Sequence, residues 1–290
     1  MTGQNHKLGV GLMVLTMAVF AAQDGISRHL ASEYNVIMIV MIRYWFFVCF
    51  ILAISARHKG GLRRVARTKQ PLLQISRGIL LVAEICVMVA AFTYLGLVES
   101  LAVFGAYPLL VAALSGPVLG EKVGPIRWIA ICIGFVGLWI ILQPGAGLFS
   151  IYSLIPVCSA LMFALYALLT RYAARQDDAM TSFFWTGAAG AVAITIFGVW
   201  TWEPMSGSDW QLMVILGCTG ALGHWMMIKA YALAEASILQ PFAYLHLVFG
   251  SAVGVLIFFE PISTNVAIGA SVVVGAGLFT IWRERQKKAV

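Results

Sequence analysis

Charged side chains are scarce in this chain of 290 residues: Asp, Glu, Lys and Arg make up 11% of it, whereas hydrophobic residues make up 61%. Soluble domains carry about 25% charged residues. This composition, with a mean hydropathy of +0.92, excludes a soluble globular protein, and lipid must surround most side chains. The 5 cysteines all fall inside apolar runs, where a free thiol behaves as a small hydrophobic group. We therefore expect neither disulfides nor a zinc site.

Several chemical motifs are absent as well. The sequence contains no G-x-x-x-x-G-K-[ST] loop, which argues against an energy-coupling ATPase. It contains no H-E-x-x-H and no G-x-S-x-G motif, so two common groups of hydrolases are excluded. No cluster of His, Cys and Asp has the spacing of metal ligands. We expect no enzymatic activity, no bound metal and no cofactor.

Long apolar runs are what the chain has instead. A bilayer is crossed by about 20 helical residues, and ten runs come close to that length. They lie at residues 8–30, 35–55, 72–97, 100–119, 126–143, 151–173, 180–201, 209–233, 237–259 and 263–282. A secretory signal peptide is the alternative for the first run. We interpret the run as a helix, because its end has a counterpart later in the chain.

An internal repeat divides the sequence. Residues 91–121 align without a gap with residues 230–260, a constant shift of 139 positions, and residues 20–31 match residues 163–174. Repeats in a hydrophobic chain are typical of secondary transporters, in which two related halves enclose one site. We predict one transmembrane domain made of a first repeat at 1–145 and a second at 146–290.

Positive charge is distributed unevenly between the predicted loops. The loop at 57–69 is strongly basic, whereas its counterpart in the second repeat contains Glu203 and Asp209 and no Lys or Arg. Since Lys and Arg mark the cytoplasmic side, we predict that both termini are cytoplasmic. Five helices per repeat is an odd number, so the second repeat enters the membrane from the opposite side. The predicted fold is therefore all-α and integral to the membrane, with ten transmembrane helices as two inverted five-helix repeats.

The chain resembles the drug/metabolite transporter superfamily, specifically its EamA family of ten-helix carriers, over both repeats. The resemblance rests on the FA…SRH segment from Phe20, on Arg43, and on the pattern AFTYLGLVESLAVFGAYPLLVAALSGPVLGEKV with its Gly-Glu pair. The second copy, AYALAEASILQPFAYLHLVFGSAVGVLIFFEPIS, departs from it: Leu247 stands at the place of Pro108. The resemblance implies export or exchange of small metabolites across the bacterial inner membrane. Amino-acid exporters, including the YddG-type exporters of aromatic amino acids, are the most similar members.

Ionisable side chains at membrane depth are costly and are therefore functional candidates. At about 1.5 Å of rise per residue, Glu84 and His224 lie near the middle of their predicted helices. They are candidates to bind a substrate ammonium or to pass a proton; the alternative is that they only satisfy neighbours inside the bundle. The other candidates for an apolar pocket with convergent polar groups are Gln23, Tyr94, Tyr107, Phe163, Tyr166, Trp185, Trp225, Tyr244 and His246. For the aromatic ones, a lipid-facing position is the alternative.

A second group of residues is assigned to gating or structure. Pro108 and Pro241 fall within predicted helices and can kink them, and two glutamates end predicted helices at matching positions of the repeats, where they suggest a repeated gate or capping contact. These candidates are Arg43, Pro108, Glu121, Pro241 and Glu260. Arg77 and Lys229 lie near cytoplasmic helix ends, where long side chains reach to the interface.

We interpret the chain as a secondary transporter that exports small metabolites, most simply amino acids and among them aromatic ones, by alternating access at a central cavity. The alternatives are a carrier for another metabolite or drug class, a channel, and a non-transporting membrane subunit. The expected partners are a small-molecule substrate and membrane lipid, with the chain as a monomer or weak homo-oligomer. The net charge of +7 follows from membrane orientation, so we expect no nucleic acid.

Overall fold

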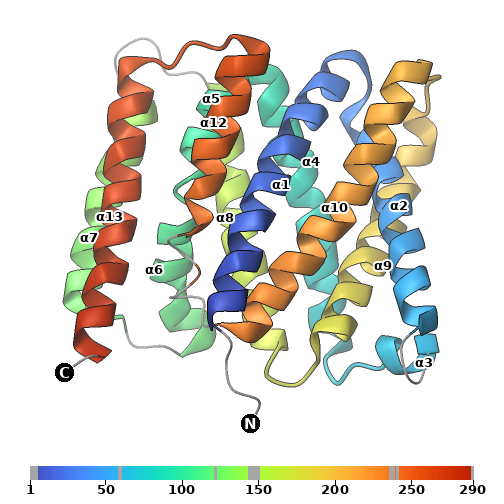
Figure 1. The fold of residues 1–290 in the computed structure, drawn as a ribbon, viewed down its shortest axis with the longest axis horizontal. Helices are drawn as coiled ribbons and strands as arrows, with labels where there is room; N and C mark the ends of the chain where they lie inside the picture. The colour runs from blue at the N-terminus through green and yellow to red at the C-terminus, as the bar shows by residue number, and fades with distance from the viewer. Residues whose placement is uncertain are drawn as a thin grey trace.

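The computed structural model describes residues 6–57, 61–120, 123–142, 151–234, 239 and 242–288, which form helices and no strand (Figure 1). The helices before residue 145 are α1 (His6–Glu33), α2 (Val36–Arg57), α3 (Gly61–Ala66), α4 (Pro71–Leu95), α5 (Leu97–Phe104), α6 (Tyr107–Leu119) and α7 (Pro125–Leu142). Those after it are α8 (Leu154–Ala173), α9 (Ala179–Gly198), α10 (Gly207–Leu233), α12 (Leu245–Phe258) and α13 (Thr264–Lys288). Short 3₁₀ turns lie at Ile151–Ser153 and Val199–Thr201.

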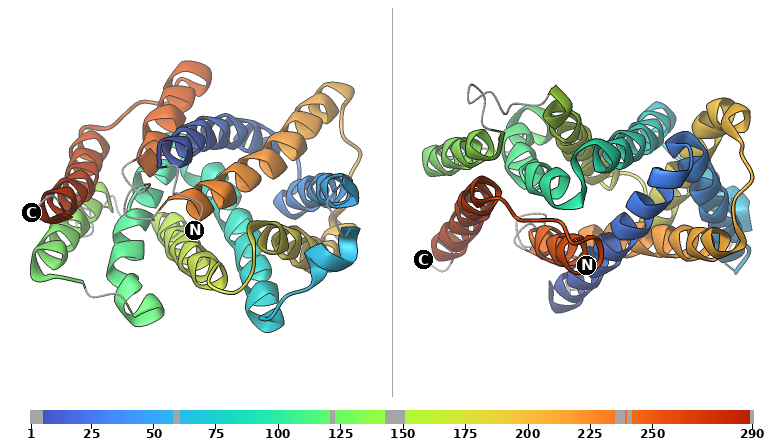
Figure 2. Two further views of the ribbon diagram at one scale, coloured as in Figure 1. Left: turned by 60° about the horizontal axis from the view of Figure 1, so that its bottom comes forward. Right: turned by 90° about the horizontal axis from the view of Figure 1, so that it is seen from above.

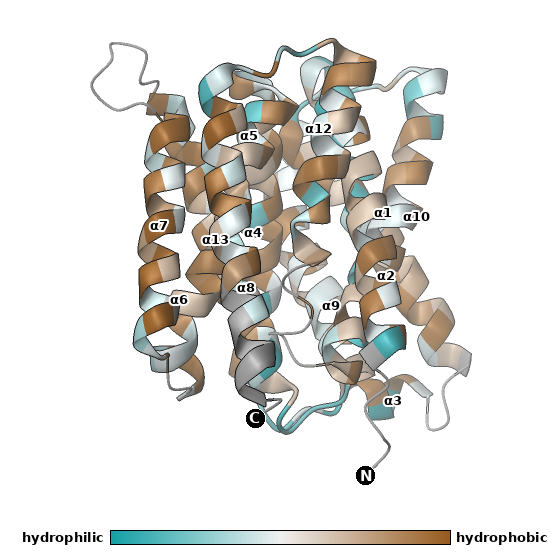
Figure 3. Cartoon of the chain, turned by 60° about the vertical axis from the view of Figure 1, so that its left-hand side comes forward, coloured by the Kyte–Doolittle hydropathy of each residue, from teal (hydrophilic) through white to brown (hydrophobic). Residues whose placement is uncertain are grey.

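Seven segments of the described chain are long and apolar enough to cross a membrane. They are Lys7–Glu33, Val36–Ala56, Pro71–Leu95, Leu97–Leu119, Ile151–Ala173, Ala179–Thr201 and Gly207–Leu233. Shorter apolar helices cover Trp128–Leu142, Leu245–Phe258 and Thr264–Phe279. Hydrophobic residues predominate along α7, and hydrophilic residues are frequent in the loops at the ends of the bundle (Figure 3). The chain is thus a multi-pass membrane protein, whereas the count of ten spans and the inversion of the repeats stay predictions.

The two halves of the chain interlock rather than fold side by side. The most extensive helix pairings are α7 with α13, α1 with α10, α4 with α8 and α9, and α2 with α9. Each pairing joins a helix before residue 145 to one after it. The α7–α13 pair stands at one edge of the bundle, and the start of α1 and the end of α13 lie at the same end of it (Figures 1 and 2). Most of the core of the molecule therefore lies between the halves.

One predicted span is divided in two. The run at 100–119 is broken after Phe104, where α5 ends, and α6 begins at Tyr107. Pro108 sits in the first turn of α6, where its missing N–H costs no helical hydrogen bond. Pro108 therefore lies directly after a break in the helical run rather than inside an unbroken helix, and a gating role for it stays a prediction. Two other structural candidates, Glu121 and Pro241, lie outside the described residues.

Glycines allow the closest approach between α5 and α12. A Cβ atom on Gly254 would lie 2.6 Å from Cγ2 of Val98, and one on Gly250 would collide with Leu101. A larger residue at either position would require the Val98 or Leu101 side chain to shift, so the two glycines allow the close packing. α12 is thereby seated against α5, and this contact places the start of α12 beside the break between α5 and α6.

Candidate functional site

A cavity lies between the two halves of the chain, inside the bundle. Eight helices contribute side chains to it: α1, α2, α4, α5, α6, α8, α10 and α12. The lining residues are Met17, Phe20, Gln23, Asp24, Arg43, Glu84, Ile85, Met88, Val89, Phe92, Phe104, Tyr107, Phe163, His224 and His246.

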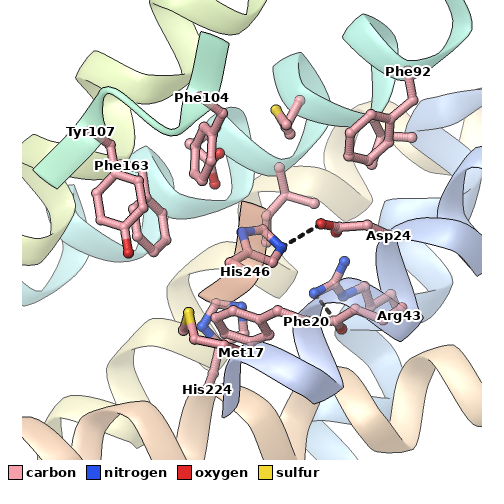
Figure 4. A pocket seen from close by; sticks show the side chains of 15 residues that line it. Met17, Phe20, Asp24, Arg43, Phe92, Phe104, Tyr107, Phe163, His224 and His246 are labelled. Atoms are coloured by element: carbon pink, nitrogen blue, oxygen red, sulfur yellow. Dashed lines mark hydrogen bonds and ion pairs between the residues drawn. The ribbon is translucent and has the colours of Figure 1, made fainter. Parts of the chain in front are cut away.

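One wall of the cavity is polar. Nη2 of Arg43 on α2 donates a hydrogen bond to Oε1 of Gln23 on α1, at 2.9 Å. Oδ2 of Asp24 lies 2.7 Å from Nε2 of His246, at the first turn of α12. Figure 4 shows Asp24 and Arg43 on the same side of the cavity, and the ring of His246 on α12 points toward Asp24. The Asp24–His246 contact therefore joins the first half of the chain to the second across the cavity.

The Arg43–Gln23 pair fits because α10 has no side chain at Gly220. A Cβ atom there would lie 2.8 Å from Nε of Arg43 and 3.4 Å from Oε1 of Gln23. A Cβ at 2.8 Å from that nitrogen is too close, so any larger residue would push the guanidinium away from its present position. Gly220 and His224 are four residues apart on α10 and so share one face of the helix. That face of α10 therefore leaves space for Arg43 at Gly220 and contributes His224 to the wall of the cavity.

Glu84 is the polar residue of α4 in the cavity, and its side chain is buried. Oγ of Ser159 on α8 donates a 2.6 Å hydrogen bond to Oε1 of Glu84. Among the described residues, Oε2 accepts no hydrogen bond. Ionisable groups at membrane depth cost about 2.5 kcal/mol or more and mark functional sites. Glu84 thus offers an acceptor to whatever occupies the cavity.

The opposite wall is aromatic. The ring centroids of Tyr107 and Phe163 are 4.9 Å apart, and those of Phe104 and Phe163 are 5.4 Å apart. On the other side, Phe20 lies 5.1 Å from the ring of His224. Figure 4 shows the first three rings gathered on the side away from Asp24 and Arg43. Rings at these spacings favour a flat aromatic ligand through offset or edge-to-face contacts.

The structure brings some of the predicted binding residues together and separates others. Those that line the cavity are Gln23, Glu84, Tyr107, Phe163, His224 and His246. Tyr107 and His246, which the 139-residue shift pairs, both stand in the first turn of a helix, α6 and α12 respectively. The two repeats therefore place equivalent residues against one cavity.

The remaining predicted binding residues lie elsewhere, as their contacts show. Tyr94 is 58% exposed and stacks on Tyr152 at the end of α4. Nε1 of Trp185 donates to the carbonyl oxygen of Ala66 in α3. Tyr166 is buried next to Arg77, Trp225 packs against Phe183 and Lys229, and Tyr244 packs against Gly277 of α13. An aromatic residue near the middle of a predicted helix can thus face any neighbour, and the sequence does not say which.

Other cavity residues were missed by sequence reasoning. On α4 the spacing from Glu84 to Met88 and Phe92 follows one helical face, so helical periodicity was a usable signal. Asp24 adjoins Gln23, yet only the glutamine was predicted to bind substrate. Arg43 was assigned to gating or structure, whereas the structure places its guanidinium in the polar wall.

Glu260 lies at the end of the bundle opposite the termini and holds three elements together. It accepts hydrogen bonds from the backbone N–H groups of Leu97 at 2.9 Å and Val98 at 2.7 Å, which begin α5. Nη2 of Arg28 on α1 lies 2.6 Å from Oε1 of the same carboxylate. A negative charge at a helix N-terminus is stabilising. A capping contact therefore exists at Glu260, while the repeated role with Glu121 stays a prediction.

Arg77 is fully buried and does not reach the interface, so that expectation is wrong. Its Nη1 donates to Oγ1 of Thr170 at 2.9 Å, and its Nη2 donates to Oε1 of Gln74 and to the carbonyl oxygen of Ser182, both at 2.7 Å. These partners belong to α8, α4 and α9. These hydrogen bonds hold both Nη atoms of the guanidinium inside the protein, where a buried polar group needs such partners.

Asp177, in the turn between α8 and α9, extends this network to the preceding loop. It accepts hydrogen bonds from Nε2 of Gln74 at 2.9 Å, from the Thr68 hydroxyl, and from the backbone N–H of Lys69 at 3.1 Å. Partial burial disfavours its charged form, but these hydrogen bonds outweigh burial and hold the pKa of Asp177 below its usual range. The carboxylate thus fastens the loop before α4 to the α8–α9 turn.

Comparisons with known proteins agree over nearly the whole chain. The model of the EamA-like transporter family matches residues 7–143 and 150–282. A riboflavin transporter of Vibrio cholerae is 27% identical over 99% of this chain and 98% of its own length. An S-adenosylmethionine uptake transporter of Rickettsia felis is 24% identical over 98% and 95%, and the pseudopaline exporter CntI of Pseudomonas aeruginosa is 23% identical over 92% and 94%. A solved crystal structure superimposes with a TM-score of 0.69 at 18% identity, covering 98% of this chain and 99% of the other, which shows that the fold is shared.

Proposed function

Because the chain belongs to the EamA-like transporter family, we propose that it is a membrane carrier for a small metabolite that combines a flat heteroaromatic ring with polar groups. The observation that carries this proposal is the two-sided cavity, in which an aromatic wall with Phe104, Tyr107 and Phe163 faces a polar wall with Asp24 and Arg43. Ring contacts favour a flat ring system, and the polar wall favours hydrogen-bonding substituents on the same molecule.

The relatives support a substrate class other than simple amino acids. Riboflavin and S-adenosylmethionine, which name two of them, both contain a nitrogen heterocycle and a polar chain. Amino-acid export, expected from the sequence, is not supported by these names, and the alternative of a carrier for another metabolite fits them better. The names include both uptake and export.

Alternating access is the mechanism that this architecture supports. Contacts between the halves surround the cavity, and the Asp24–His246 contact spans it from α1 to α12. The cavity would be exposed in turn to each side of the membrane as the halves rearrange around a fixed site. Glu260 at one end of the bundle and the Arg77 network toward the other connect helices of both halves. These contacts are candidates to break and reform in the transport cycle.

Counterflow in proteoliposomes tests the proposal. Vesicles loaded with unlabelled riboflavin or S-adenosylmethionine should accumulate the same labelled compound in a saturable way, whereas protein-free vesicles should not. Vesicles loaded with amino acids provide the comparison with the sequence-based expectation. Accumulation of labelled amino acids alone, with neither heteroaromatic compound transported or competing, would contradict the proposed substrate class.

Phe163→Ala tests the aromatic wall, with Tyr94→Ala as its matched control. Loss of the Phe163 ring should raise KM about two- to twelvefold, because one aromatic contact contributes about 0.5–1.5 kcal/mol. Tyr94 lies outside the cavity on Tyr152, so its removal should leave KM unchanged. Equal effects of the two substitutions on KM would argue against the cavity as the binding site.

A further inference from the structure

The charged residues of the cavity do not pair with one another. Asp24, Glu84 and Arg43 all line it, yet Arg43 hydrogen-bonds to an amide oxygen, Glu84 to a serine hydroxyl and Asp24 to a histidine. Elsewhere in the described chain, Arg28 and Glu260 form a direct ion pair at 2.6 Å. Helices packed this closely can bring opposite charges together, and in the cavity they do not.

Charges without ionic partners are expensive inside a membrane protein. The desolvation of an ion is offset only when an opposite charge and further hydrogen bonds meet it. Apart from Gln23, Tyr107 and the two histidines, the other lining side chains are apolar and provide no such compensation. An occupant with its own charges at matching places would provide it. The positions of these charged side chains therefore indicate where the substrate carries charges of opposite sign.

Arg43 is suited to receive a carboxylate. A guanidinium has five N–H donors in a planar fork that matches two carboxylate oxygens. Among the described residues, Arg43 donates a hydrogen bond to Gln23 alone. Gly220 and Gln23 fix the guanidinium against α10 and α1. Its orientation is thus set before a ligand arrives, which lowers the entropic cost of binding.

Glu84 is suited to receive a cation. Ser159 holds Oε1, and Oε2 is left for the cavity. Glu84 and Asp24 make two carboxylates against the single guanidinium of Arg43. The two carboxyl groups therefore favour a ligand that carries at least one cationic group.

Resting on the function proposed above, we propose that the transported metabolite carries a carboxylate and at least one cationic group on the chain attached to its ring, with the carboxylate bound at Arg43 and the cation at Glu84. A heteroaromatic compound without ionised groups would leave Arg43 and Glu84 without a partner of opposite charge. S-Adenosylmethionine has the required groups, and riboflavin at neutral pH has none. The two compounds are therefore the discriminating probes.

The first arm measures wild-type transport of both probes. Labelled S-adenosylmethionine should enter proteoliposomes in a saturable way, and unlabelled riboflavin should compete at least tenfold more weakly than unlabelled S-adenosylmethionine. Saturable riboflavin uptake without competition from S-adenosylmethionine would overturn the charge assignment and leave the heteroaromatic carrier intact. Failure to carry either compound, in vesicles that contain folded protein, would overturn both proposals.

The second arm assigns the carboxylate to Arg43. Decarboxylated S-adenosylmethionine lacks only that group. Arg43→Gln should raise KM for S-adenosylmethionine about tenfold and leave KM for the decarboxylated compound unchanged, because the interacting group is then already missing. Arg63→Gln, on the short helix α3, is the matched control and should change neither value. Equal losses for both compounds in Arg43→Gln would overturn the assignment.

The third arm assigns the cation to Glu84. Glu84→Gln should raise KM for S-adenosylmethionine about tenfold and leave KM for 5′-methylthioadenosine, which keeps the ring and lacks the charged groups, unchanged. Glu33→Gln at the exposed end of α1 is the matched control. An effect of Glu84→Gln on both compounds alike would overturn the assignment of the cation to Glu84.

If Arg43→Gln fails to fold, Arg43→Lys keeps the positive charge and should give an intermediate KM with S-adenosylmethionine only.

Discussion

At the scale of single residues, small side chains decide where large ones can go. Gly220 illustrates this: the absence of a side chain on α10 allows the guanidinium of Arg43 to lie against the helix backbone and next to Gln23. Nothing about Gly220 in the sequence distinguishes it from the other 27 of the 28 glycines. Its importance comes from what approaches it, which only the fold determines.

Gly220→Ala should therefore weaken substrate binding without preventing folding. The added methyl group would stand 2.8 Å from Nε of Arg43 and displace it, with the loss of a charged hydrogen bond of about 1.5 kcal/mol, or about tenfold in KM. Gly11→Ala on α1, where a Cβ would meet nothing within 4 Å, is the control. Transport kinetics in proteoliposomes measure both; an unchanged KM in Gly220→Ala would show that Arg43 can move freely.

At the scale of helices, the sequence predicted the elements well and their breaks poorly. The apolar runs predicted helices over all the described spans, because hydrophobic length is a local property. The break between Phe104 and Tyr107 was missed, since Pro108 was read as a kink inside a helix. A proline is also well tolerated in the first turn of a helix. Whether it kinks a helix or starts a new one depends on whether other parts of the chain satisfy the backbone groups left without a helical hydrogen bond.

The start of α5 shows how a distant residue supplies such a partner. Glu260→Ala should remove the acceptor of the Leu97 and Val98 N–H groups and the partner of Arg28, lowering the stability by about 2 kcal/mol. Thermal unfolding in detergent measures the change, and Glu33→Ala is the control at an exposed helix end. A melting temperature equal to that of the control would mean that water replaces the carboxylate without loss.

The turn between α8 and α9 should give the protein an acid-sensitive contact. Because hydrogen bonds hold the pKa of Asp177 below its usual range, its contribution to stability is present above the unfolded-state value of about 3.9. That contribution is lost as pH falls through the lower folded-state pKa. Asp177→Asn should be less stable than wild type at pH 7, and the difference should shrink below about pH 4. Thermal unfolding as a function of pH measures this; a difference that persists in acid would assign the effect to packing.

At the scale of the whole molecule, the repeat predicted that two halves enclose one site. The paired positions Tyr107 and His246 do line one cavity, whereas the identities of the other wall residues depend on helix rotation, which the sequence leaves open. Helix rotation is set by contacts between residues that lie far apart in the sequence. The polar wall joins α1 and α2 to α12 and α10, and no local pattern reports contacts across more than 170 positions, such as His246 with Asp24.

The interlocked halves should reassemble when the chain is divided. Since α1 pairs with α10, α2 with α9 and α7 with α13, each half lacks its main packing partners when alone. Co-expression of residues 1–145 and 146–290 as separate polypeptides should restore transport, whereas either part alone should be degraded. Co-purification and counterflow measure this. Stable, folded accumulation of one half by itself would contradict the interlocked arrangement.

The same interlocking has a consequence for biosynthesis. The ribosome delivers α1, α2 and α4 to the membrane before α8, α9, α10 or α12 has been made. Gln23, Arg43 and Glu84 therefore enter the bilayer before His224 and His246, which later close the cavity around them, and before Ser159, the hydrogen-bond partner of Glu84. The nascent first half must hold these polar groups in lipid, or with the insertion machinery, until translation reaches the second half. We therefore expect the polar residues of the cavity to make the half-finished chain less stable in the membrane than the complete chain.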